Sequence, residues 1–442
     1  MRLTVNEAAK AVNGKLLFGN ENDFFEFVST DTREELSGKL FIPLKGENFD
    51  GHDYIEKAAS DGALGYLTQN DEVFPCPFAI KVENTQKAIG DLARYVLQKS
   101  NATIIGITGS VGKTTTRQFI ASVVSKIGKT AATFGNLNND IGLPLSILKM
   151  DGDEKFAVLE MGMNALGEIS YLSKIAQPDI SVITLIGTSH IEYLGSRENI
   201  LKAKLEILDG AKNNTLILNG TDPILLGLKE KYNPKYYGNY EILSDSPTGK
   251  FIIDSEEYEI DIAGKHNITN ASCAVLIGKL LGAGYEQIRD GLKEFEQVKY
   301  RQTIEIIDNK TIILDCYNSS LDSDLAALSV LKSYKGGRKV AILGSIGEMG
   351  EFLEEALNKV GEGVYENKID LLICVDENSS YIKDGAIKAG MKDASIISFE
   401  TKEALFDNLA SILRDGDTIL IKASRKYKFE EIHEFLKQDR KV

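Results

Sequence analysis

The segment from Gly106 to Thr116, which reads GITGSVGKTTT, contains the residue types that hold a nucleoside triphosphate. An apolar strand precedes it, and glycines at 109 and 112 lead into Lys113 at the start of a helix. Glycines let backbone N–H groups turn toward phosphate oxygens, and a helix N-terminus favours anions. Lys113 would reach the β- and γ-phosphates, and the hydroxyl of Thr114 would bind Mg²⁺. The segment therefore predicts ATP binding.

The match to the usual phosphate-loop pattern is incomplete. G-x-x-x-x-G-K-[ST] requires glycine at position 107, where this chain has Ile107. A glycine-rich turn before an ordinary helix is the alternative interpretation. The strand before the turn, the helix after it and the GKTTT run favour phosphate binding. The predicted loop consists of Gly109, Ser110, Val111, Gly112, Lys113, Thr114 and Thr115.

Three further polar features follow the loop along the chain. The asparagines of GNLNNDIGLPLSIL (135–148) fit a surface turn and a ligand-facing loop equally well. Glu160 ends the apolar strand FAVLE, where a carboxylate would reach the Mg²⁺ of a phosphate-loop site, although a solvated carboxylate is the alternative. His190 follows the next apolar strand, and we weigh a functional role evenly against a structural one.

Charged residues of the later chain form a second set. Lys204 lies in ENILKAKLEIL, which taken alone predicts a helix with a solvated charged face. Asp315 ends the first strand of a later α/β run, the topological position at which ligands are held. Lys422, Ser424 and Arg425 lie at the end of its last strand, where basic side chains would bind phosphate or carboxylate.

Composition restricts the class of protein. The chain has 442 residues, 43% of them hydrophobic and 26% charged, as expected of a soluble protein with two or three domains. The net charge of −14 argues against nucleic acid as a partner. The sequence shows no apolar run of about 18 residues and no signal-peptide pattern. Four scattered cysteines without a CxxC pair fit a reducing compartment, so we expect a cytoplasmic protein.

Hydrophobic periodicity predicts an α/β protein of three domains. Residues 1–98 mix short strands with helices, and residues 99–302 alternate strand and helix as in a doubly wound parallel sheet. Residues 303–442 alternate again as a Rossmann-like domain without G-x-G-x-x-G, which argues against a dinucleotide. The expected strands of the last two domains are 103–108, 156–162, 180–187, 215–220, 311–316, 339–344, 370–375, 395–399 and 418–423.

Taken in order, these motifs resemble those of the Mur ligase family over almost the whole chain. The resemblance rests on STDTREELSGKLFIPLKGENFDGHDYI, TGSVGKTTT, GNLNNDIGLPLSIL, LEMGMNALGEI, IGTSHIEYLGSRENILKAKLEI, GKHNITNASCAV, Tyr317-Asn318 and the KASR segment at 422–425. GNxNNxIGxPL followed by EMGxxxxGEI indicates the MurF type. The resemblance implies a UDP-substrate domain over 1–98, an ATP-binding domain over 99–302 and a Rossmann-like domain over 303–442 that binds the amine.

The resemblance also implies roles for individual residues. Beyond the loop, ATP would contact Asn267, Asn270, Arg301 and Asp315. Two Mg²⁺ ions would be held by Thr114, Glu160, His190 and Lys204, the last as a carbamate, and Lys113 completes the catalytic set. The UDP-substrate would contact Ser29, Asp31, Arg33, Gly46, Asn48, Asp50, His52, Asn136, Asn138 and Asn139. The amine substrate would contact Tyr317, Asn318, Lys422, Ser424 and Arg425.

The implied reaction is ATP-dependent addition of D-alanyl-D-alanine to UDP-N-acetylmuramoyl-tripeptide in peptidoglycan synthesis. Phosphorylation of the terminal carboxylate gives an acyl phosphate, which the amine attacks with release of phosphate. Lys113 and two Mg²⁺ ions would neutralise the developing charge, while domain closure excludes water. We expect a monomer that acts on small molecules.

The C-terminal domain departs from the MurF pattern at Leu314, Ser320, Leu321, Ser345 and Ala423. These departures motivate a second hypothesis, a paralogous Mur-type amide ligase with a different amine or acid substrate. A third hypothesis is a nucleotide-binding regulatory protein without catalysis, against which the intact ATP and metal residues argue. The sequence leaves open whether the third residue of the tripeptide is meso-diaminopimelate or lysine.

Overall fold

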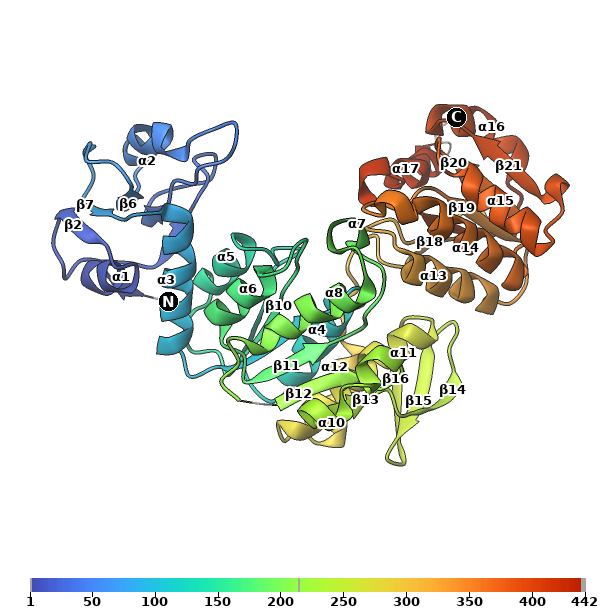
Figure 1. Ribbon diagram of the computed structural model, residues 1–442, viewed down its shortest axis with the longest axis horizontal. Helices are drawn as coiled ribbons and strands as arrows, with labels where there is room; N and C mark the ends of the chain where they lie inside the picture. Colours follow the sequence, from blue (N-terminus) through green and yellow to red (C-terminus); the bar gives the residue numbers. More distant parts are fainter. Residues whose placement is uncertain (1, 214, 439–442) are drawn as a thin grey trace. The chain divides into compact units, whose positions relative to one another are not determined.

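A computed structural model describes residues 2–213 and 215–438 as an α/β protein (Figure 1). The chain divides into two compact units. The first comprises the chain up to Thr108 with Ile127–Val182 and Ala203–Leu216, and the second comprises Gly109–Lys126, Ile183–Lys202 and the chain from Ile217. The expected α/β class is confirmed, whereas the domain boundaries near 98 and 302 stay predictions.

The N-terminal part of the first unit contains a five-stranded sheet in the order β2-β7-β6-β5-β4. Parallel pairing joins β4 to β5, β5 to β6 and β6 to β7, while β2 is antiparallel to β7. Leu36, Phe41, Ile55 and Tyr66 form the centre of its core. The elements are β1 (Leu3–Thr4), α1 (Val5–Ala11), β2 (Lys15–Phe18), β3 (Phe24–Phe25), β4 (Phe27–Ser29), β5 (Lys39–Phe41), η1 (Gly51–Tyr54), α2 (Ile55–Ser60), β6 (Gly65–Thr68), β7 (Phe78–Lys81) and α3 (Thr85–Lys99).

A six-stranded central sheet has the order β13-β12-β11-β8-β10-β9, and both β8 and β9 run parallel to β10. The sequence predicts four of its six strands, of which the one expected over 180–187 ends at Ile183, and it misses the short edge strands β9 and β13. The elements are β8 (Thr103–Thr108), α4 (Lys113–Ser125), β9 (Thr130–Ala132), α5 (Gly142–Leu148), β10 (Phe156–Glu160), α6 (Glu168–Ala176), β11 (Ile180–Ile183), α7 (Ile191–Leu194), α8 (Arg197–Leu205), η2 (Glu206–Leu208), β12 (Thr215–Asn219), α9 (Pro223–Leu226), α10 (Lys229–Tyr232), β13 (Lys235–Tyr237), α11 (Lys265–Leu280) and α12 (Tyr285–Lys293).

A small antiparallel sheet interrupts the alternation expected over 99–302. It consists of β14 (Glu241–Ser244), β15 (Gly249–Ile253) and β16 (Glu256–Ile260), in that order. Phe251 and Tyr258 pair across β15 and β16 and are fully buried, while charged residues such as Glu257 lie on the other side of the strand. The alternation expected over 99–302 therefore does not include residues 241–260, where the chain forms this antiparallel sheet.

The C-terminal sheet has the order β17-β18-β22-β19-β20-β21. Only β17 is antiparallel to its neighbour, so the strand expected to be first in this domain, β18, is the second. Helices pack on both faces, as Figure 1 shows in orange and red. The elements are β17 (Thr303–Ile307), β18 (Lys310–Leu314), α13 (Leu321–Ser333), β19 (Lys339–Leu343), η3 (Gly350–Phe352), α14 (Leu353–Glu366), β20 (Leu371–Val375), α15 (Ser380–Ala389), η4 (Asp393–Ser395), β21 (Ile396–Phe399), α16 (Lys402–Ile412), β22 (Thr418–Lys422), η5 (Arg425–Tyr427) and α17 (Glu430–Gln438).

The strand order places three loops at one edge of this sheet. β22 lies between β18 and β19, and all three strands are parallel. Asp315, Gly344 and Ala423 directly follow these strands, so they emerge at the carboxyl edge, where open α/β sheets bind ligands. No helix among the described residues is long and apolar enough to cross a membrane.

Candidate active site

Two glycines with left-handed backbone shape the loop between β8 and α4. Gly109 has φ +148° and Gly112 has φ +86°. A Cβ at Gly109 would lie 2.0 Å from Oγ1 of Thr184, and a Cβ at Gly112 would lie 2.9 Å from Oδ1 of Asn270. Both positions therefore need glycine. Ile107, where the usual motif has glycine, is a fully buried residue of β8 and precedes the turn itself.

Hydrogen bonds close the loop over the Lys113 side chain. Nζ of Lys113 donates to the carbonyl oxygen of Gly109 at 2.8 Å, and the N–H of Ser110 donates to the carbonyl of Leu185 at 2.8 Å. Among the described residues no side chain caps α4, which begins at Lys113. Its first N–H groups therefore point to an anion site at the loop.

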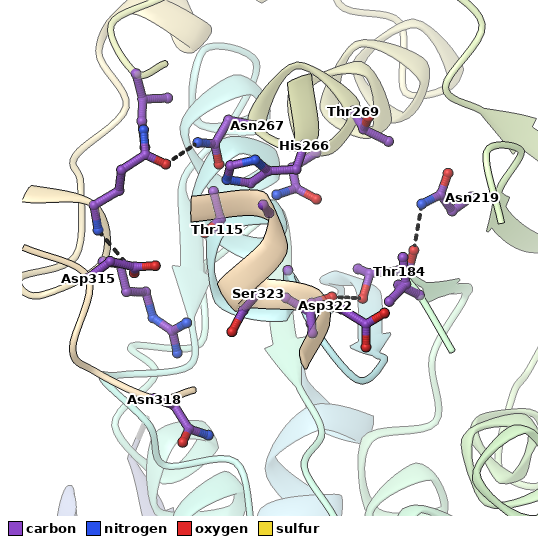
Figure 2. Close-up of a pocket in the computed structure, with 18 of the residues that line it drawn as sticks. Thr115, Thr184, Asn219, His266, Asn267, Thr269, Asp315, Asn318, Asp322 and Ser323 are labelled. Carbon is purple, nitrogen blue, oxygen red and sulfur yellow. Dashed lines mark hydrogen bonds between the residues drawn. The ribbon is translucent and has the colours of Figure 1, made fainter. Parts of the chain in front are cut away.

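A cavity of about 190 Å³ lies beside this loop within the second unit (Figure 2). Seven of the eleven residues predicted to bind ATP line it, namely Val111, Gly112, Thr115, Asn267, Asn270, Arg301 and Asp315. The other walls come from Thr184, Leu185, Asn219, Thr221, Ile262, His266, Thr269, Gln302, Asn318, Asp322, Ser323, Ala326 and Lys422. The fold thus brings the loop, α11 and the carboxyl edge of the C-terminal sheet to one cavity.

Arg301 links the loop to the C-terminal sheet. Its Nη2 donates to Oγ1 of Thr114 at 3.2 Å, and its guanidinium lies 4.2 Å from the centre of the Tyr317 ring. The residues on either side, Tyr300 (φ +65°) and Gln302 (φ +55°), both have left-handed backbone. The N–H of Gln302 donates to Oδ1 of Asp315 at 3.2 Å. This short junction therefore positions two of the predicted ATP residues.

Lys422 is buried between two carboxylates. Its Nζ lies 2.7 Å from Oδ2 of Asp315 and 3.6 Å from Oδ1 of Asp324, and it donates to the carbonyl of Asn318 at 3.1 Å. Burial alone would lower the pKa of Lys422, but the two carboxylates outweigh it and raise that pKa. Burial raises the pKa of Asp324 to about 6, against the opposing effects of Lys422 and a hydrogen bond from Ser319. Lys422 therefore neutralises Asp315 at the cavity beside the phosphate loop.

A second cavity, of about 360 Å³, contains three of the five residues predicted to bind the amine. Asn318, Ser424 and Arg425 line it, whereas Tyr317 and Lys422 do not. Oγ of Ser424 accepts a hydrogen bond from the N–H of Gly347 at 2.7 Å. The remaining walls are Ser189, Glu192, Tyr193, Ser319, Ser320, Ile346, Gly347, Glu348, Met349 and Lys426.

The departures from the MurF pattern have structural roles. Oγ of Ser345 donates to Oδ1 of Asp376 at 2.7 Å, and its N–H donates to the other carboxylate oxygen at 2.7 Å. Oγ of Ser320 accepts from the N–H of Ser323 at the start of α13. Leu314 and Ala423 are buried in the core of the sheet.

His190 pairs with a carboxylate. It has φ +64° at the start of α7, and its Nδ1 lies 2.6 Å from Oε2 of Glu348. The hydrogen bond from His190 lowers the pKa of Glu348. Because the imidazole faces a carboxylate from the loop after β19, it is not a purely apolar core histidine.

Glu160 lies at the end of β10, as predicted, and is only 2% exposed. Its Oε1 accepts from Nδ2 of Asn138 at 2.8 Å, and its N–H donates to Oγ1 of Thr133 at 2.8 Å. Asn138 therefore faces Glu160 and is not a solvated turn residue. Oδ1 of Asn139 instead accepts from the N–H of Gly142 at 2.8 Å, and Asn136 is exposed.

Lys204 contradicts the expectation of a solvated helix face, because it is fully buried. Ile200, Ala203 and Ile207 are also fully buried and share its side of the helical turn. The lysine occupies a position in a stripe of apolar residues, while Lys202 is exposed. A periodicity argument that counts every lysine as solvated misassigns such a position.

The residues predicted to bind the UDP-substrate near β4 form a compact turn. The hydroxyl of Ser29, which is buried, donates to Oε2 of Glu34 at 3.0 Å. Asp31 and Arg33 form a two-pronged ion pair, with Nη2 of Arg33 2.6 Å from Oδ2 of Asp31. The hydrogen bond from Arg33 lowers the pKa of Asp31 to about 2. The Arg33 side chain is otherwise exposed.

His52 organises the loop that begins at Gly46. Oδ1 of Asp50 accepts from the backbone N–H of His52 at 3.0 Å and lies 2.6 Å from its Nδ1. Nε2 of His52 accepts from the N–H of Gln69 at 3.2 Å. The N–H of Gly46 donates to the carbonyl of Phe49 at 2.9 Å, and Asn48 is exposed. Only the exposed part of this loop can contact a ligand without rearrangement.

Several residues of the candidate site were not predicted from the sequence. His266, Gln302 and Asp322 line the first cavity, Glu348 lines the second, and Asp324 pairs with Lys422. His266 and Gln302 adjoin the predicted Asn267 and Arg301, and this proximity is the one signal that pointed to them. Asp324 and Glu348 belong to no motif that we recognised. Their roles follow from pairing with Lys422 and His190, which are distant in sequence.

Three family models match the chain in succession. "Mur ligase family, catalytic domain" matches residues 25–96, "Mur ligase middle domain" matches 107–278, and "Mur ligase, glutamate ligase domain" matches 301–425.

Named relatives and solved structures match over nearly the whole length. UDP-N-acetylmuramoyl-tripeptide–D-alanyl-D-alanine ligase of Bacillus subtilis is 38% identical, with 98% of both chains covered, and that of Haemophilus influenzae is 32% identical with the same coverage. MurF from Acinetobacter baumannii superposes with a TM-score of 0.89 at 27% identity, covering 99% of both chains. MurF ligase from Thermotoga maritima in complex with ADP has a TM-score of 0.82 at 26% identity, covering 94% of this chain and 99% of that one. The geometry of the phosphate loop and the full-length similarity agree, and the chain belongs to the Mur ligase family.

Proposed function

We propose that the protein is an ATP-dependent ligase that joins D-alanyl-D-alanine to UDP-N-acetylmuramoyl-tripeptide, a step of peptidoglycan precursor synthesis. The relatives that carry this activity in their names match the chain from end to end. The observation that carries the proposal is the cavity at the phosphate loop, which also contains Arg301 and Asp315.

ATP would bind with its phosphates against the loop. The N–H groups at the start of α4 and the Nζ of Lys113 would hold the β- and γ-phosphates. Lys113 now donates to the carbonyl of Gly109, so it would exchange this bond for a phosphate oxygen. Arg301 already reaches Thr114 and would contribute a second cation as the γ-phosphoryl group transfers.

The reaction proceeds in two balanced steps. The terminal carboxylate of the tripeptide displaces ADP from the γ-phosphorus and forms an acyl phosphate. The amine of D-alanyl-D-alanine then attacks the acyl carbon, loses a proton and expels inorganic phosphate. Domain closure over the site would keep water from the acyl phosphate.

We retain the proposal that Thr114, Glu160, His190 and Lys204 provide ligands for two Mg²⁺ ions. The hydroxyl, the carboxylate and the imidazole are suitable donors, and Glu160 is a buried carboxylate at the end of a strand. When bound, Mg²⁺ neutralises the charge on the transferring phosphoryl group. Asn138 would orient Glu160 through its hydrogen bond to Oε1.

Lys204 would serve as a carbamate. Lys204 is fully buried, and addition of carbon dioxide to a lysine amine gives an anion with two oxygen donors. In ¹³C-bicarbonate the protein should show a carbamate resonance by ¹³C NMR. Lys204→Arg keeps a cation but should remove this resonance, while Lys202→Arg, on the exposed side of the helix, should retain it. A spectrum without the resonance in the unaltered protein would exclude the carbamate.

The amine would bind in the second cavity, where Ser424 and Arg425 lie. Arg425 is exposed and its Nη1 lies 2.9 Å from Oε1 of Glu430, so its guanidinium could contact the carboxylate of a dipeptide. The departures at Ser345 and Ala423 adjoin this cavity and favour testing other amines.

Phosphate release tests the proposal. It should require ATP, UDP-N-acetylmuramoyl-tripeptide and D-alanyl-D-alanine together, with meso-diaminopimelate and lysine tripeptides tried in parallel. Preference for another amine or acid would support a paralogous amide ligase. A Lys113→Ala change that leaves phosphate release unaltered would contradict the proposed catalytic role.

We further propose that the enzyme works in the cytoplasm as a monomer, without nucleic acid. Its proposed substrates are small molecules, and ATP is a cytoplasmic substrate. Light scattering during size-exclusion chromatography should give the mass of one chain.

A further inference from the structure

Two buried amides share one carbonyl acceptor at the wall of the nucleotide cavity. Nδ2 of Asn267 donates to the carbonyl of Ala263 at 2.8 Å and to Oε1 of Gln302 at 3.0 Å. Nε2 of Gln302 donates to the same carbonyl of Ala263 at 2.8 Å. Asn267 is 3% exposed and Gln302 is 5% exposed, and both line the cavity. The bond between the amides is the dashed line at Asn267 in Figure 2.

This network fixes the orientation of both amides. A backbone carbonyl only accepts hydrogen bonds, so the amide atom that faces Ala263 must be nitrogen in each case. Rotation of Asn267 by half a turn would place its oxygen against two acceptors. Both hydrogens of its Nδ2 are used, and Oδ1 accepts no hydrogen bond from any residue between 2 and 438 that the structure describes.

The cavity therefore presents an acceptor, and not a donor, at Asn267. The phosphate loop supplies Gly112 and Thr115 to one part of the cavity, and α11 supplies His266 and Asn267 to another. With phosphates at the loop, the base of a nucleotide lies on the α11 side. An exocyclic amine on the base would donate to Oδ1 of Asn267, while an oxygen at the same place would face another oxygen and leave both unsatisfied.

We propose that Gln302 is a specificity-determining residue, which locks the Asn267 amide so that the cavity selects a 6-amino purine over a 6-oxo purine. Gln302 acts through Asn267 and is a positioning residue. The inference rests on the proposed use of ATP at this cavity. It assigns a function to a residue that no motif of the sequence indicated.

The backbone of Gln302 reinforces this lock. Its N–H donates to Oδ1 of Asp315 at 3.2 Å, and its carbonyl accepts from Nε2 of Gln297 at 2.8 Å. The left-handed φ of +55° is sparsely populated by residues other than glycine and asparagine. These two hydrogen bonds hold the Gln302 backbone in this conformation. The Gln302 side chain is therefore directed toward Asn267.

Binding of ADP and IDP by isothermal titration tests the proposal without acceptor or amine. These nucleotides differ in the 6-substituent of the base and in the hydrogen that the 6-oxo base carries on N1. The unaltered protein should bind ADP roughly 10- to 100-fold more tightly than IDP. Gln302→Met removes both side-chain bonds at nearly constant size, so the Asn267 amide can rotate to donate. The ADP-to-IDP affinity ratio should then fall at least about fivefold.

Gln118→Met is the matched control. Gln118 also donates from its side-chain amide to a backbone carbonyl, that of Glu296, but it does not line the cavity. Its affinity ratio should stay within about twofold of the unaltered protein. If Gln302→Met fails to fold, Gln302→Asn is the second variant. Asparagine tolerates a positive φ, but its side chain is too short to reach both Asn267 and the carbonyl of Ala263.

Equal affinity for ADP and IDP in the unaltered protein would overturn the inference and leave the proposed function standing, since ADP binds. An unchanged ratio in a folded Gln302 variant would also overturn it. Absence of binding for both nucleotides would overturn the inference together with the proposed use of ATP.

Discussion

At the scale of single residues, the candidate site is held by buried polar side chains that neutralise or orient one another. Lys422 lies between Asp315 and Asp324, and Asn138 holds Glu160. Burying these groups costs desolvation, which the pairing offsets only in part. The sites therefore carry groups whose protonation differs between the folded and the unfolded chain.

Asp324 should make the stability of the protein depend on pH. The folded chain holds the Asp324 proton up to about pH 6, whereas an ordinary Asp releases it near 3.8. The folded state binds more protons between these values, so the free energy of unfolding should fall as pH rises through this window, by up to roughly 3 kcal/mol. Asp324→Asn should flatten this dependence in urea unfolding measured from pH 4 to 7.

Asp322→Asn serves as the control for that experiment. Asp322 lies in the same first turn of α13 but is less buried, and its Oδ2 accepts from the N–H of Thr188. This variant should keep the pH dependence of the unaltered protein. Coincident pH profiles for Asp324→Asn and the unaltered chain would contradict the role assigned to Asp324.

At the scale of elements, the phosphate loop depends on backbone that only glycine adopts readily. Gly112 and Gly282 both have φ +86°, but a Cβ at Gly282 has no atom within 4 Å among the described residues. Ala at either position should cost about 1 kcal/mol of stability. Only Gly112→Ala also meets Asn270 at the cavity, so it alone should weaken ADP binding, by roughly tenfold or more.

Thermal unfolding and ADP titration of both variants separate the two effects. Similar losses of stability, with ADP affinity reduced only in Gly112→Ala, are expected. If Gly282→Ala weakened ADP binding equally, the loss would come from general destabilisation and not from the loop.

The sequence predicted the elements whose patterns are local and missed those that depend on tertiary partners. Apolar strands such as 339–343 and 371–375 are buried on both faces, and their continuous runs mark them clearly. β16 alternates charged and apolar residues from Glu257 to Ile260, which is typical of a half-exposed strand, whereas β14 and β15 lack such a regular pattern and therefore escape a prediction based on periodicity.

The same limit applies to the candidate site. The phosphate loop and Glu160 follow from local motifs, but the burial of Lys204 and the roles of Gln302, Asp324 and Glu348 depend on partners distant in sequence. A charged residue within an apolar stripe of a helix is predicted to be exposed to solvent. Only the structure shows which other element packs over that face and buries it. The resemblance to the family indicated a functional role for Lys204, whereas hydrophobic periodicity did not.

At the scale of the whole molecule, the nucleotide cavity draws walls from segments far apart in the chain. Thr115, Asn267 and Asp322 lie within one cavity of the second unit although some 200 residues separate the first from the last. A ligand that binds only the folded form should therefore stabilise this unit as a whole. ADP at 100 times its Kd should add about 2.7 kcal/mol to the free energy of unfolding.

Arg301→Ala should reduce this stabilisation at the same ADP concentration, because it removes the contact with Thr114. Arg289→Ala is the control, since that arginine pairs with Glu286 and Asp290 on α12 and does not line the cavity. Thermal unfolding with and without ADP measures both. Equal ADP-induced shifts in the two variants would argue that Arg301 does not contribute to nucleotide binding.

The stacking of Arg301 on Tyr317 also offers a position for a fluorescent reporter. The chain contains no tryptophan, so Tyr317→Trp would introduce a single indole directly beneath the guanidinium. Its emission would change when Arg301 leaves the ring for a phosphate, and no other indole would obscure the signal. One substitution would thus turn the junction between the phosphate loop and the C-terminal sheet into a fluorescent reporter, which could follow each turnover in real time.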